Sequence, residues 1–414
     1  MAEELADQPK GTAEELADQP KGTAEELADQ REFVFTEEQG ALRSAVRKFC
    51  ADHIGESAVR AAMESDPPFD RKVWQRLGSE LGVLGLSVPE SAGGVGGTLI
   101  DQAVAVEQLG AALAFGPLFG TVYLAIPALV AATQTSPLLE PLMDGSRTAA
   151  FAVNDTAGAF DPSAVTVDAT GDGQSWTVTG TVERVVDAAA ADVLLVAAKT
   201  ADGIGLFAVD ADSAEVQRDS LGTLDLTRPQ ATVTFSGAAA QLIAGADEAE
   251  RVITHALHVG GALLAVEQVG AAQHLLDLST EYARTRLQFG RPIGSFQAVK
   301  HRLADDLVAV EHARSTAFHA VWALTDGSDD PALAVSIAQA TCSAAFVRVA
   351  GDTIQVHGGI GFTWEHQAHL YYKRAYTDAA LLGSAEQHRA RIAEFILDAA
   401  PEKDAPRVAT GLSS

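Results

Sequence analysis

A change in the spacing of apolar residues along this sequence limits the folds open to it more than any other feature. From Phe35 to about Thr133 and from Asp247 to about Ala400, apolar residues recur at helical spacing. Residues 146–245 instead alternate apolar and polar with a period of two, as in Ala164–Asp168 and Ala231–Phe235. Asp-Gly and Thr-Gly turns separate the alternating runs. This order predicts an α+β fold in which an antiparallel β-domain lies between an N-terminal helical domain and a C-terminal four-helix bundle.

Five segments follow from these patterns. We expect a disordered repeat tail at 1–32, a helical domain at 33–145, a β-domain at 146–245, a helical bundle at 246–400 and a flexible tail at 401–414. The first tail is a tandem repeat, because the sequence AEELADQPKGT of residues 2–12 recurs at 13–23 and in part at 24–30. Each full copy carries a helix-breaking Pro-Lys-Gly-Thr unit and little that could form a core. A short interaction helix is the alternative.

Local signals place several elements within these domains. Thr36-Glu-Glu-Gln39 forms a capping box ahead of an apolar helical pattern, which predicts that a helix begins there. The apolar stretch Thr121–Thr133 is shorter than the roughly 18–20 residues that a membrane span needs and contains Pro127, so we interpret it as a buried helix. The glycines of Val88–Gly97 predict a loop.

The charge of the chain limits its partners. A formal net charge of −27 argues against nucleic acid and against an anionic membrane, because both would repel the average surface. The two cysteines, Cys50 and Cys342, cannot build a disulfide framework, and the sequence does not open with the basic and apolar segments of a secretory signal. These features predict a cytoplasmic protein.

Arg286-Leu-Gln-Phe-Gly290 is the first segment that could carry chemistry, together with Arg291, Pro292 and Gln297. A planar guanidinium can hold a pyrophosphate through two parallel hydrogen bonds, and an aromatic ring a few residues away can support an adenine or sugar face. The alternative is a basic helix end that only faces solvent.

Gln355-Val-His-Gly-Gly-Ile-Gly-Phe362 is the second such segment and lies between two helical patterns. Paired glycines let a ligand approach backbone N–H groups closely, as in anion and dinucleotide sites, although a tight interhelical turn would use the same residues. For His357 a structural role is favoured over a catalytic one. No second histidine or cysteine at ligand spacing suggests a metal site.

Together these segments resemble the acyl-CoA dehydrogenases in content, order and spacing. The resemblance is carried by Pro89-Glu-Ser-Ala-Gly-Gly94, Arg286-Leu-Gln-Phe-Gly290, Phe296-Gln-Ala298 and Gln355-Val-His-Gly-Gly359, and it runs from about Phe35 to about Leu397. In that family a bound FAD stretches across a subunit interface. The resemblance implies that six residues hold the adenosine and pyrophosphate of an FAD whose ring lies in the neighbouring subunit: Arg286, Phe289, Gln297, Gln355, Gly358 and Gly359. It also implies flavin contacts for Ser384 and Glu386.

The chemistry of the family needs a carboxylate that takes the proton beside the thioester carbonyl, while flavin N5 accepts the β-hydride. The family's Tyr-Glu-Gly-Thr segment corresponds here to Leu381-Leu-Gly-Ser384, which puts Leu382 at the position of the base. Other members carry the base on an earlier helix, where the ungapped match is Gly260. Neither residue can abstract a proton, so no catalytic residue is assigned. Glu267 remains a candidate base if that helix is offset from its ungapped match to the family.

The flavin-ring contacts of the family also differ here. Its Thr-Glu-Pro and Trp-X-Thr segments correspond to Asn154-Asp-Thr-Ala-Gly158 and to Arg184-Val-Val186, so the hydroxyl expected near flavin N5 is missing at Val186. The resemblance therefore implies the subunit without a base in a heteromeric α2β2 enzyme, as in certain bacterial acyl-CoA dehydrogenases that act on steroid side chains. Its expected partners are a homologous subunit, an acyl-CoA substrate from fatty-acid or steroid side-chain β-oxidation, and an electron-transfer flavoprotein.

Two alternatives stay open at the level of sequence. One is a homotetrameric acyl-CoA dehydrogenase with a non-standard base, for which Glu267, Asp378 and Glu386 are the candidates. The other is a flavin-free relative that serves as a scaffold or binds CoA esters.

Overall fold

A computed structural model describes residues 35–171, 175–327 and 329–397 of the chain. The tails predicted at 1–32 and 401–414 lie outside the described residues. The chain divides into two units, residues 1–40 and 41–414. In the first unit the Gln39 backbone N–H donates to Thr36 Oγ1 (3.2 Å) and the Thr36 N–H donates to Gln39 Oε1 (3.1 Å). These two bonds confirm the predicted capping box and the helix that it begins.

The N-terminal region is helical, as predicted. The segment predicted as a buried helix is confirmed, because η2 is a π-helix that continues into α6 and both are buried. The predicted loop at Val88–Gly97 contains only the short turn η1. The elements are α2 (Glu37–His53), α3 (Glu56–Met63), α4 (Arg71–Ser79), η1 (Glu90–Ala92), α5 (Leu99–Ala111), η2 (Leu118–Ala125), α6 (Ile126–Ala131) and α7 (Leu139–Met143).

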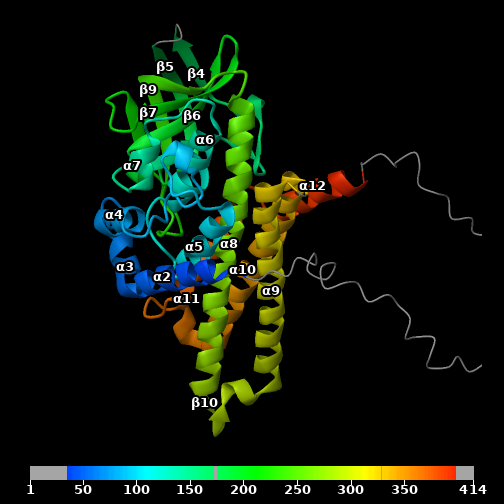
Figure 1. Cartoon of the computed structure of the whole chain (residues 1–414). Coiled ribbons are helices and arrows are strands. Elements are labelled where there is room, and N and C mark those ends of the chain that lie inside the picture. The colour runs from blue at the N-terminus through cyan, green and yellow to red at the C-terminus, as the bar shows by residue number, and fades with distance from the viewer. Residues whose placement is uncertain (1–34, 172–174, 328, 398–414) are drawn as a thin grey trace, which may run out of the picture. The chain divides into compact units, whose positions relative to one another are not determined.

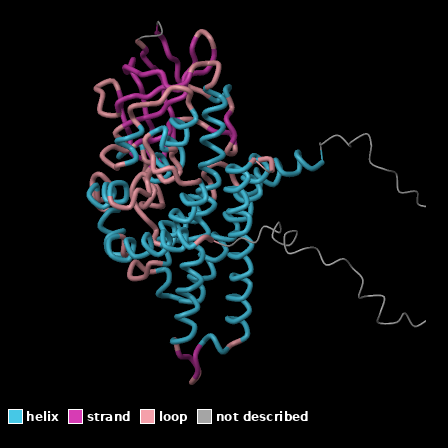
Figure 2. The backbone as a smooth tube through the Cα atoms, viewed as in Figure 1, coloured by secondary structure: helices cyan, strands magenta, loops and turns pink. Residues whose placement is uncertain are grey.

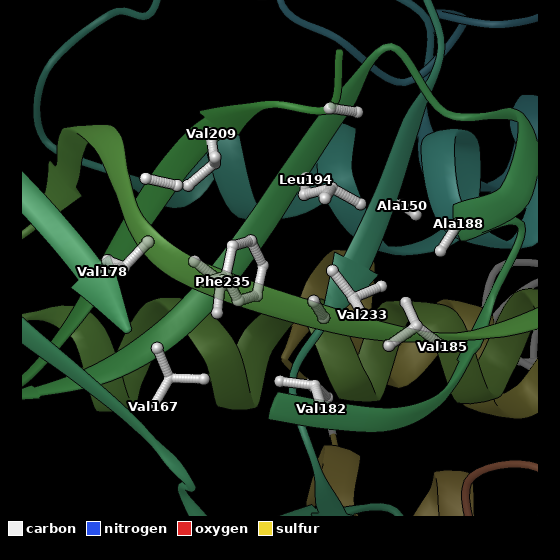
Figure 3. Close-up of a cluster of buried hydrophobic side chains, with 14 of the residues drawn as sticks. Ala150, Val167, Val178, Val182, Val185, Ala188, Leu194, Val209, Val233 and Phe235 are labelled. Atoms are coloured by element: carbon white, nitrogen blue, oxygen red, sulfur yellow. The ribbon is translucent and has the colours of Figure 1, made fainter. Parts of the chain in front are cut away.

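The middle region forms a seven-stranded sheet in which β6, β4, β5, β9 and β7 close into a ring, with β1 beside β6 and β8 beside β9. Inward-facing side chains such as Val178, Val233 and Phe235 fill its interior (Figure 3). The strands are β1 (Ala149–Ala152), β4 (Val167–Gly171), β5 (Trp176–Val186), β6 (Val193–Thr200), β7 (Gly203–Asp210), β8 (Val216–Ser220) and β9 (Gln230–Ala244), with the separate hairpin of β2 (Asp155–Thr156) and β3 (Ala159–Phe160).

This sheet is mixed rather than wholly antiparallel. β1 pairs with β6 in the parallel direction, and so does β4 at Asp168–Lys199, whereas the other pairs are antiparallel. Side chains alternate between the two faces of a strand in either pairing, so the period of two could not reveal the direction.

The C-terminal region returns to helices, with α8, α9 and α10 long and side by side (Figure 1). The predicted C-terminal helical bundle is confirmed: in the described residues α12 packs on α10, and the short α11 packs against α10 and α8 as an additional helix. The elements are α8 (Ala249–Thr285), β10 (Leu287–Gln288), β11 (Arg291–Pro292), η5 (Ile293–Ser295), α9 (Gln297–Asp326), α10 (Pro331–His357), η6 (Gly358–Phe362), α11 (Ala368–Asp378) and α12 (Ala385–Leu397).

Two helical segments, Ala249–Thr285 and Pro331–Phe362, are long and apolar enough to cross a membrane, which the sequence reading did not anticipate. The structure buries 83% and 61% of their most apolar windows against the rest of the chain. Burial of this extent is typical of the core helices of a bundle.

α5 and α8 pack with no space for a side chain at Gly270, where an added Cβ would lie 1.9 Å from the Glu107 carbonyl oxygen. We expect Gly270→Ala to destabilise the chain by about 1–3 kcal/mol, because the two helices must move apart. Gly351→Ala is the matched control, since its Cβ would meet nothing closer than Tyr372 at 4.0 Å and alanine favours a helix by about 1 kcal/mol. Urea unfolding measures both variants. Equal stabilities would contradict the close helix packing.

Candidate functional site

The first predicted ligand segment follows the end of α8. The Arg286 N–H caps the helix by donating to the Tyr282 carbonyl at 2.9 Å, and the Arg286 side chain is exposed. The chain then turns between β10 and β11 through Phe289 and Gly290, whose φ angles are 54° and 79°. A two-residue hairpin turn uses such positive φ values. This turn presents the Phe289 ring to solvent with 91% exposure, and Figure 2 shows the small strand pair apart from the main sheet.

The second predicted segment ends α10. Gly358 has a φ of 64°, which a glycine adopts without strain, and the turn that it forms leads into η6. An added Cβ at Gly358 or at Gly359 would meet no atom within 4 Å. Gln355 and Gln297 are exposed, at the end of α10 and the start of α9. The paired glycines therefore leave an open backbone surface instead of relieving a crowded turn.

Side-chain contacts between α8 and α10 bring the two segments together. The Ser279 hydroxyl donates to Thr353 Oγ1 (3.0 Å), and one turn further on the rings of Tyr282 and His357 stack with centroids 4.4 Å apart. Arg286 follows directly after this stack. Six of the eight predicted flavin residues thus lie at one end of the helices, on exposed surface.

Ser384 and Glu386 do not belong to this group. Ser384 begins α12, where its hydroxyl accepts from the Gln387 N–H at 3.3 Å, and Glu386 is exposed and pairs with Arg389 at 3.8 Å. They follow Leu382, which shares a cavity with Leu257 of α8. The 29 residues of continuous helix from Leu257 to Thr285, which precedes Arg286, span about 43 Å. The structure therefore separates the eight predicted residues into two places.

The second place is a groove between the β-region and the loop before α12. Its volume is about 600 Å³, and its walls include Asn154, Asp155, Arg184, Tyr376 and Leu382. Arg184 and Leu382 have φ angles of 56° and 54°, a conformation that is costly for residues other than glycine. This volume lies in the range of ligand pockets, about 300–1,000 Å³.

The inner end of this groove is nearly filled. The cavity there measures about 70 Å³ and is lined by Phe119, Leu124, Val186, Leu257 and Leu382, among others. It is several times smaller than the pockets that hold cofactors or drug-sized ligands. The cavity is too small for a flavin ring system.

Both positions where the family carries its base lie against this filled space. Leu382 is 6% exposed and lines the inner cavity. At Gly260 an added Cβ would lie 2.5 Å from Leu124 Cδ2, so a longer side chain would have to displace Leu124. The structure offers no carboxylate at either position.

Glu267 is a structural carboxylate, which argues against its interpretation as an offset base. It is 3% exposed and accepts hydrogen bonds from Tyr123 Oη (2.9 Å), Arg228 Nη2 (2.5 Å) and Arg374 Nη1 (2.6 Å). Burial opposes its ionisation, but the charges of Arg228 and Arg374 outweigh burial and lower the pKa of Glu267 to about 2. A base with such a pKa holds a proton too weakly to remove one from a thioester.

Asp378, a further candidate, is completely buried beside Arg228 Nη1 at 3.4 Å. Burial raises the pKa of its carboxyl to about 8. Asp378 does not line the groove or the inner cavity.

Asp155 is a carboxylate at this site that was not predicted as a site residue from the sequence. It lines both the groove and the inner cavity, and its Oδ1 accepts from the Gly158 N–H at 2.5 Å in the β2–β3 turn. Burial raises the pKa of the Asp155 carboxyl, while the Gly158 N–H opposes that shift. Its place in the Asn154–Gly158 segment, which corresponds to the family's Thr-Glu-Pro, was the signal that could have identified it.

Comparisons with known proteins match most of the chain. The family model for the acyl-CoA dehydrogenase N-terminal domain matches residues 36–145, and that for the acyl-CoA dehydrogenase C-terminal domain matches residues 250–397. The acyl-CoA dehydrogenase IpdE2 of Mycolicibacterium smegmatis is 37% identical over 86% of this chain and 98% of its own length.

Two solved structures are also similar. The ChsE4-ChsE5 complex from Mycobacterium tuberculosis has 30% identity and a TM-score of 0.80, over 90% of this chain and 100% of that one. The Tcur3481-Tcur3483 steroid ACAD has 31% identity and a TM-score of 0.78, over 88% and 99%.

Proposed function

The chain belongs to the acyl-CoA dehydrogenase family, and from this premise we propose that it is the subunit without a base in a hetero-oligomeric, FAD-dependent acyl-CoA dehydrogenase. It completes the flavin site of a homologous partner and does not deprotonate the substrate itself. The observation that carries this proposal is that Leu382 and Gly260 stand at the family's two base positions, beside a cavity of only about 70 Å³ that Leu382 and Leu124 line.

The exposed end of the helices fits the nucleotide half of FAD. Arg286 forms no ion pair with any residue that the structure describes, so its guanidinium is available to a pyrophosphate. Gly358 and Gly359 leave their backbone open to a ligand, and Phe289 offers an aromatic face. When bound, FAD supplies the acceptor for the β-hydride of an acyl thioester. In this chain the residues bind and orient its adenosine and pyrophosphate.

The inner cavity does not fit the other half of FAD. Val186 supplies no hydroxyl, and Phe119, Leu124 and Leu257 fill the space. A chain that retains one half-site and lacks the base and the hydroxyl of the other needs a partner with an intact ring site. The names of the two similar structures support this arrangement, because each joins two different proteins.

The proposed substrate class follows from the family and from the names of the two similar structures. We propose an acyl-CoA thioester that is converted to the trans-2-enoyl-CoA, and the steroid ACAD among the similar structures favours a steroid-derived acyl group. The proposed electron acceptor is an electron-transfer flavoprotein, and the proposed location is the cytoplasm.

Purification with and without the partner tests this proposal. We expect the chain alone to show no dehydrogenation of fatty or steroid-derived acyl-CoA with an artificial electron acceptor. Co-expression with a homologue encoded beside it should give a yellow, active complex. Normal turnover by the isolated chain would contradict the proposal, and a colourless, inactive co-purified complex would favour the scaffold alternative.

Asp155→Asn is a specific control for activity from this chain's own groove. Asp155 is half-buried and lines both the groove and the inner cavity, whereas Glu183, which also lines both, is exposed, so Asp155 would be the base if the chain were catalytic. We expect turnover of the co-expressed complex to change less than about twofold, because the partner supplies the base. A loss of roughly 10² or more, as expected for removal of a general base, would assign catalysis to this chain.

A further inference from the structure

Three aromatic rings lie in consecutive contact beside the proposed nucleotide site, one pair stacked and the other tilted, and we call them the stack. Tyr282 of α8 lies on His357 of α10 with ring centroids 4.4 Å apart and an interplanar angle of 28°, and His357 lies 4.4 Å from His366 at 45°. His366 belongs to the segment between η6 and α11. The stack therefore joins three segments that are distant in sequence.

Hydrogen bonds fix opposite tautomers for the two histidines. His357 Nδ1 is 2.8 Å from the Thr353 carbonyl, which can only accept, so Nδ1 carries a proton. His366 Nδ1 accepts from the Ala368 N–H at 3.1 Å, so the proton of neutral His366 is on Nε2. A second proton on His366 would have to occupy the atom that accepts this bond.

The surroundings keep both imidazoles neutral. Burial lowers the pKa of His357, and the Thr353 carbonyl opposes that shift. Burial also lowers the pKa of His366; the charge of Arg60, and that of His357 once it is protonated, add to the effect, and Glu56 opposes it. Tyr282 and His369 are the other titratable groups at the stack, from α8 and α11. At neutral pH the three rings can therefore lie in contact without charge repulsion.

We propose that the Tyr282–His357–His366 stack positions the two arms of the nucleotide site, the Arg286 segment and the Gly358–Gly359 turn, relative to each other. Arg286 lies one helical turn after Tyr282, and Gly358 and Gly359 follow His357 directly. The stack lies between the Ser279–Thr353 hydrogen bond and the two arms, so it is the side-chain contact between α8 and α10 nearest to the guanidinium and the glycine turn. This inference rests on the proposed function, because the arms matter only if they hold FAD together.

FAD titration of the flavin-depleted complex with the partner subunit tests the stack. We expect Tyr282→Leu to weaken FAD binding about two- to tenfold, the range that an aromatic pair contributes, while Tyr282→Phe keeps the ring and the affinity. Thermal unfolding is recorded in parallel. A lower melting temperature with unchanged FAD affinity would reduce the stack to a packing role and overturn the inference.

Arg286→Ala, measured beside these variants, separates the two proposals. If it weakens FAD binding and Tyr282→Leu does not, only the positioning role fails. If Arg286→Ala has no effect, the proposed function fails and the inference falls with it.

Acidification provides a readout that packing alone would not give. Both folded pKa values lie below the ordinary 6.5, so the neutral stack is present above pH 6.5 and is lost as the pH falls through the lowered values. We expect FAD affinity to decline over that range, and His366→Phe, which keeps a ring that cannot be charged, to flatten the decline. Identical pH profiles would overturn the inference.

The tautomers can be checked without any variant, in case Tyr282→Leu does not fold. Long-range ¹H–¹⁵N spectra of histidine-labelled protein at pH 7 should show Nδ1–H for His357 and Nε2–H for His366. The same tautomer in both residues, or an imidazolium at either, would contradict the stack.

Discussion

Replacing Glu267 with glutamine should destabilise the folded chain by about 3–5 kcal/mol, the cost of leaving a buried charge without its partner. Glu267 is the carboxylate that Arg228 and Arg374 share, and all three side chains are less than 5% exposed. Glutamine keeps the size of the side chain but leaves two guanidinium charges with less compensation. Denaturant unfolding of the isolated chain measures this loss. A change below about 1 kcal/mol would show that the network is not held as described.

The double variant Glu267→Gln with Arg228→Gln tests the pairing directly. It removes one negative and one positive charge from the same buried network. We expect it to be more stable than the sum of the two single losses predicts, because each single variant strands the other's charge. Additive losses would place the two groups in independent environments.

Asp378→Asn is the matched control within the same network and should cost little at neutral pH. Burial raises the pKa of Asp378 to about 8, so the folded chain holds this carboxyl in its neutral form at pH 7, and asparagine has nearly the same shape and charge. The folded state thus keeps a proton that the unfolded state releases above about pH 4. Wild-type stability should fall as the pH rises from about 4 to 8, and this dependence should weaken in the variant. Parallel stability profiles from pH 5 to 9 would contradict a neutral Asp378.

Replacing Arg286 with alanine should weaken FAD binding to the complex by about 1.5–3 kcal/mol, or about ten- to a hundredfold in Kd. The reason is the loss of charge-assisted hydrogen bonds to the pyrophosphate, which the exposed Arg286 guanidinium is placed to make. Fluorescence titration of the flavin-depleted complex measures the affinity, independently of turnover.

Arg284→Ala controls for the net charge of this surface. Arg284 is also exposed and lies two residues earlier on the same helix, outside the Arg286-Leu-Gln-Phe-Gly290 segment. We expect its loss to change FAD affinity less than about twofold, since a screened charge that makes no direct contact contributes little. Equal losses in the two variants would indicate general attraction of an anion rather than a bound pyrophosphate.

The sequence predicted the parts of the fold that depend on local spacing. The change of period at residues 146–245 placed the sheet between two sets of helices, and the Thr36–Gln39 capping box placed the start of α2. It could not show that β1 runs parallel to β6, because strand direction depends on how the chain returns to the sheet. Nor could the sequence show that Ser384 and Glu386 follow Leu382 beside Leu257, which α8 separates from Arg286 by about 43 Å.

What the sequence alone determined is chemical identity at single positions: leucine at 382 and glycine at 260 cannot accept a proton in any fold. What only the tertiary structure decided is the state of the groups whose partners are remote. Glu267 meets Arg228 from 39 residues before it and Arg374 from 107 residues after it. A periodic pattern reports which face of an element is buried, but the pKa of a buried group depends on charges that the folded chain brings beside it. For that reason a candidate base in the sequence became one member of a buried ion-pair network in the structure.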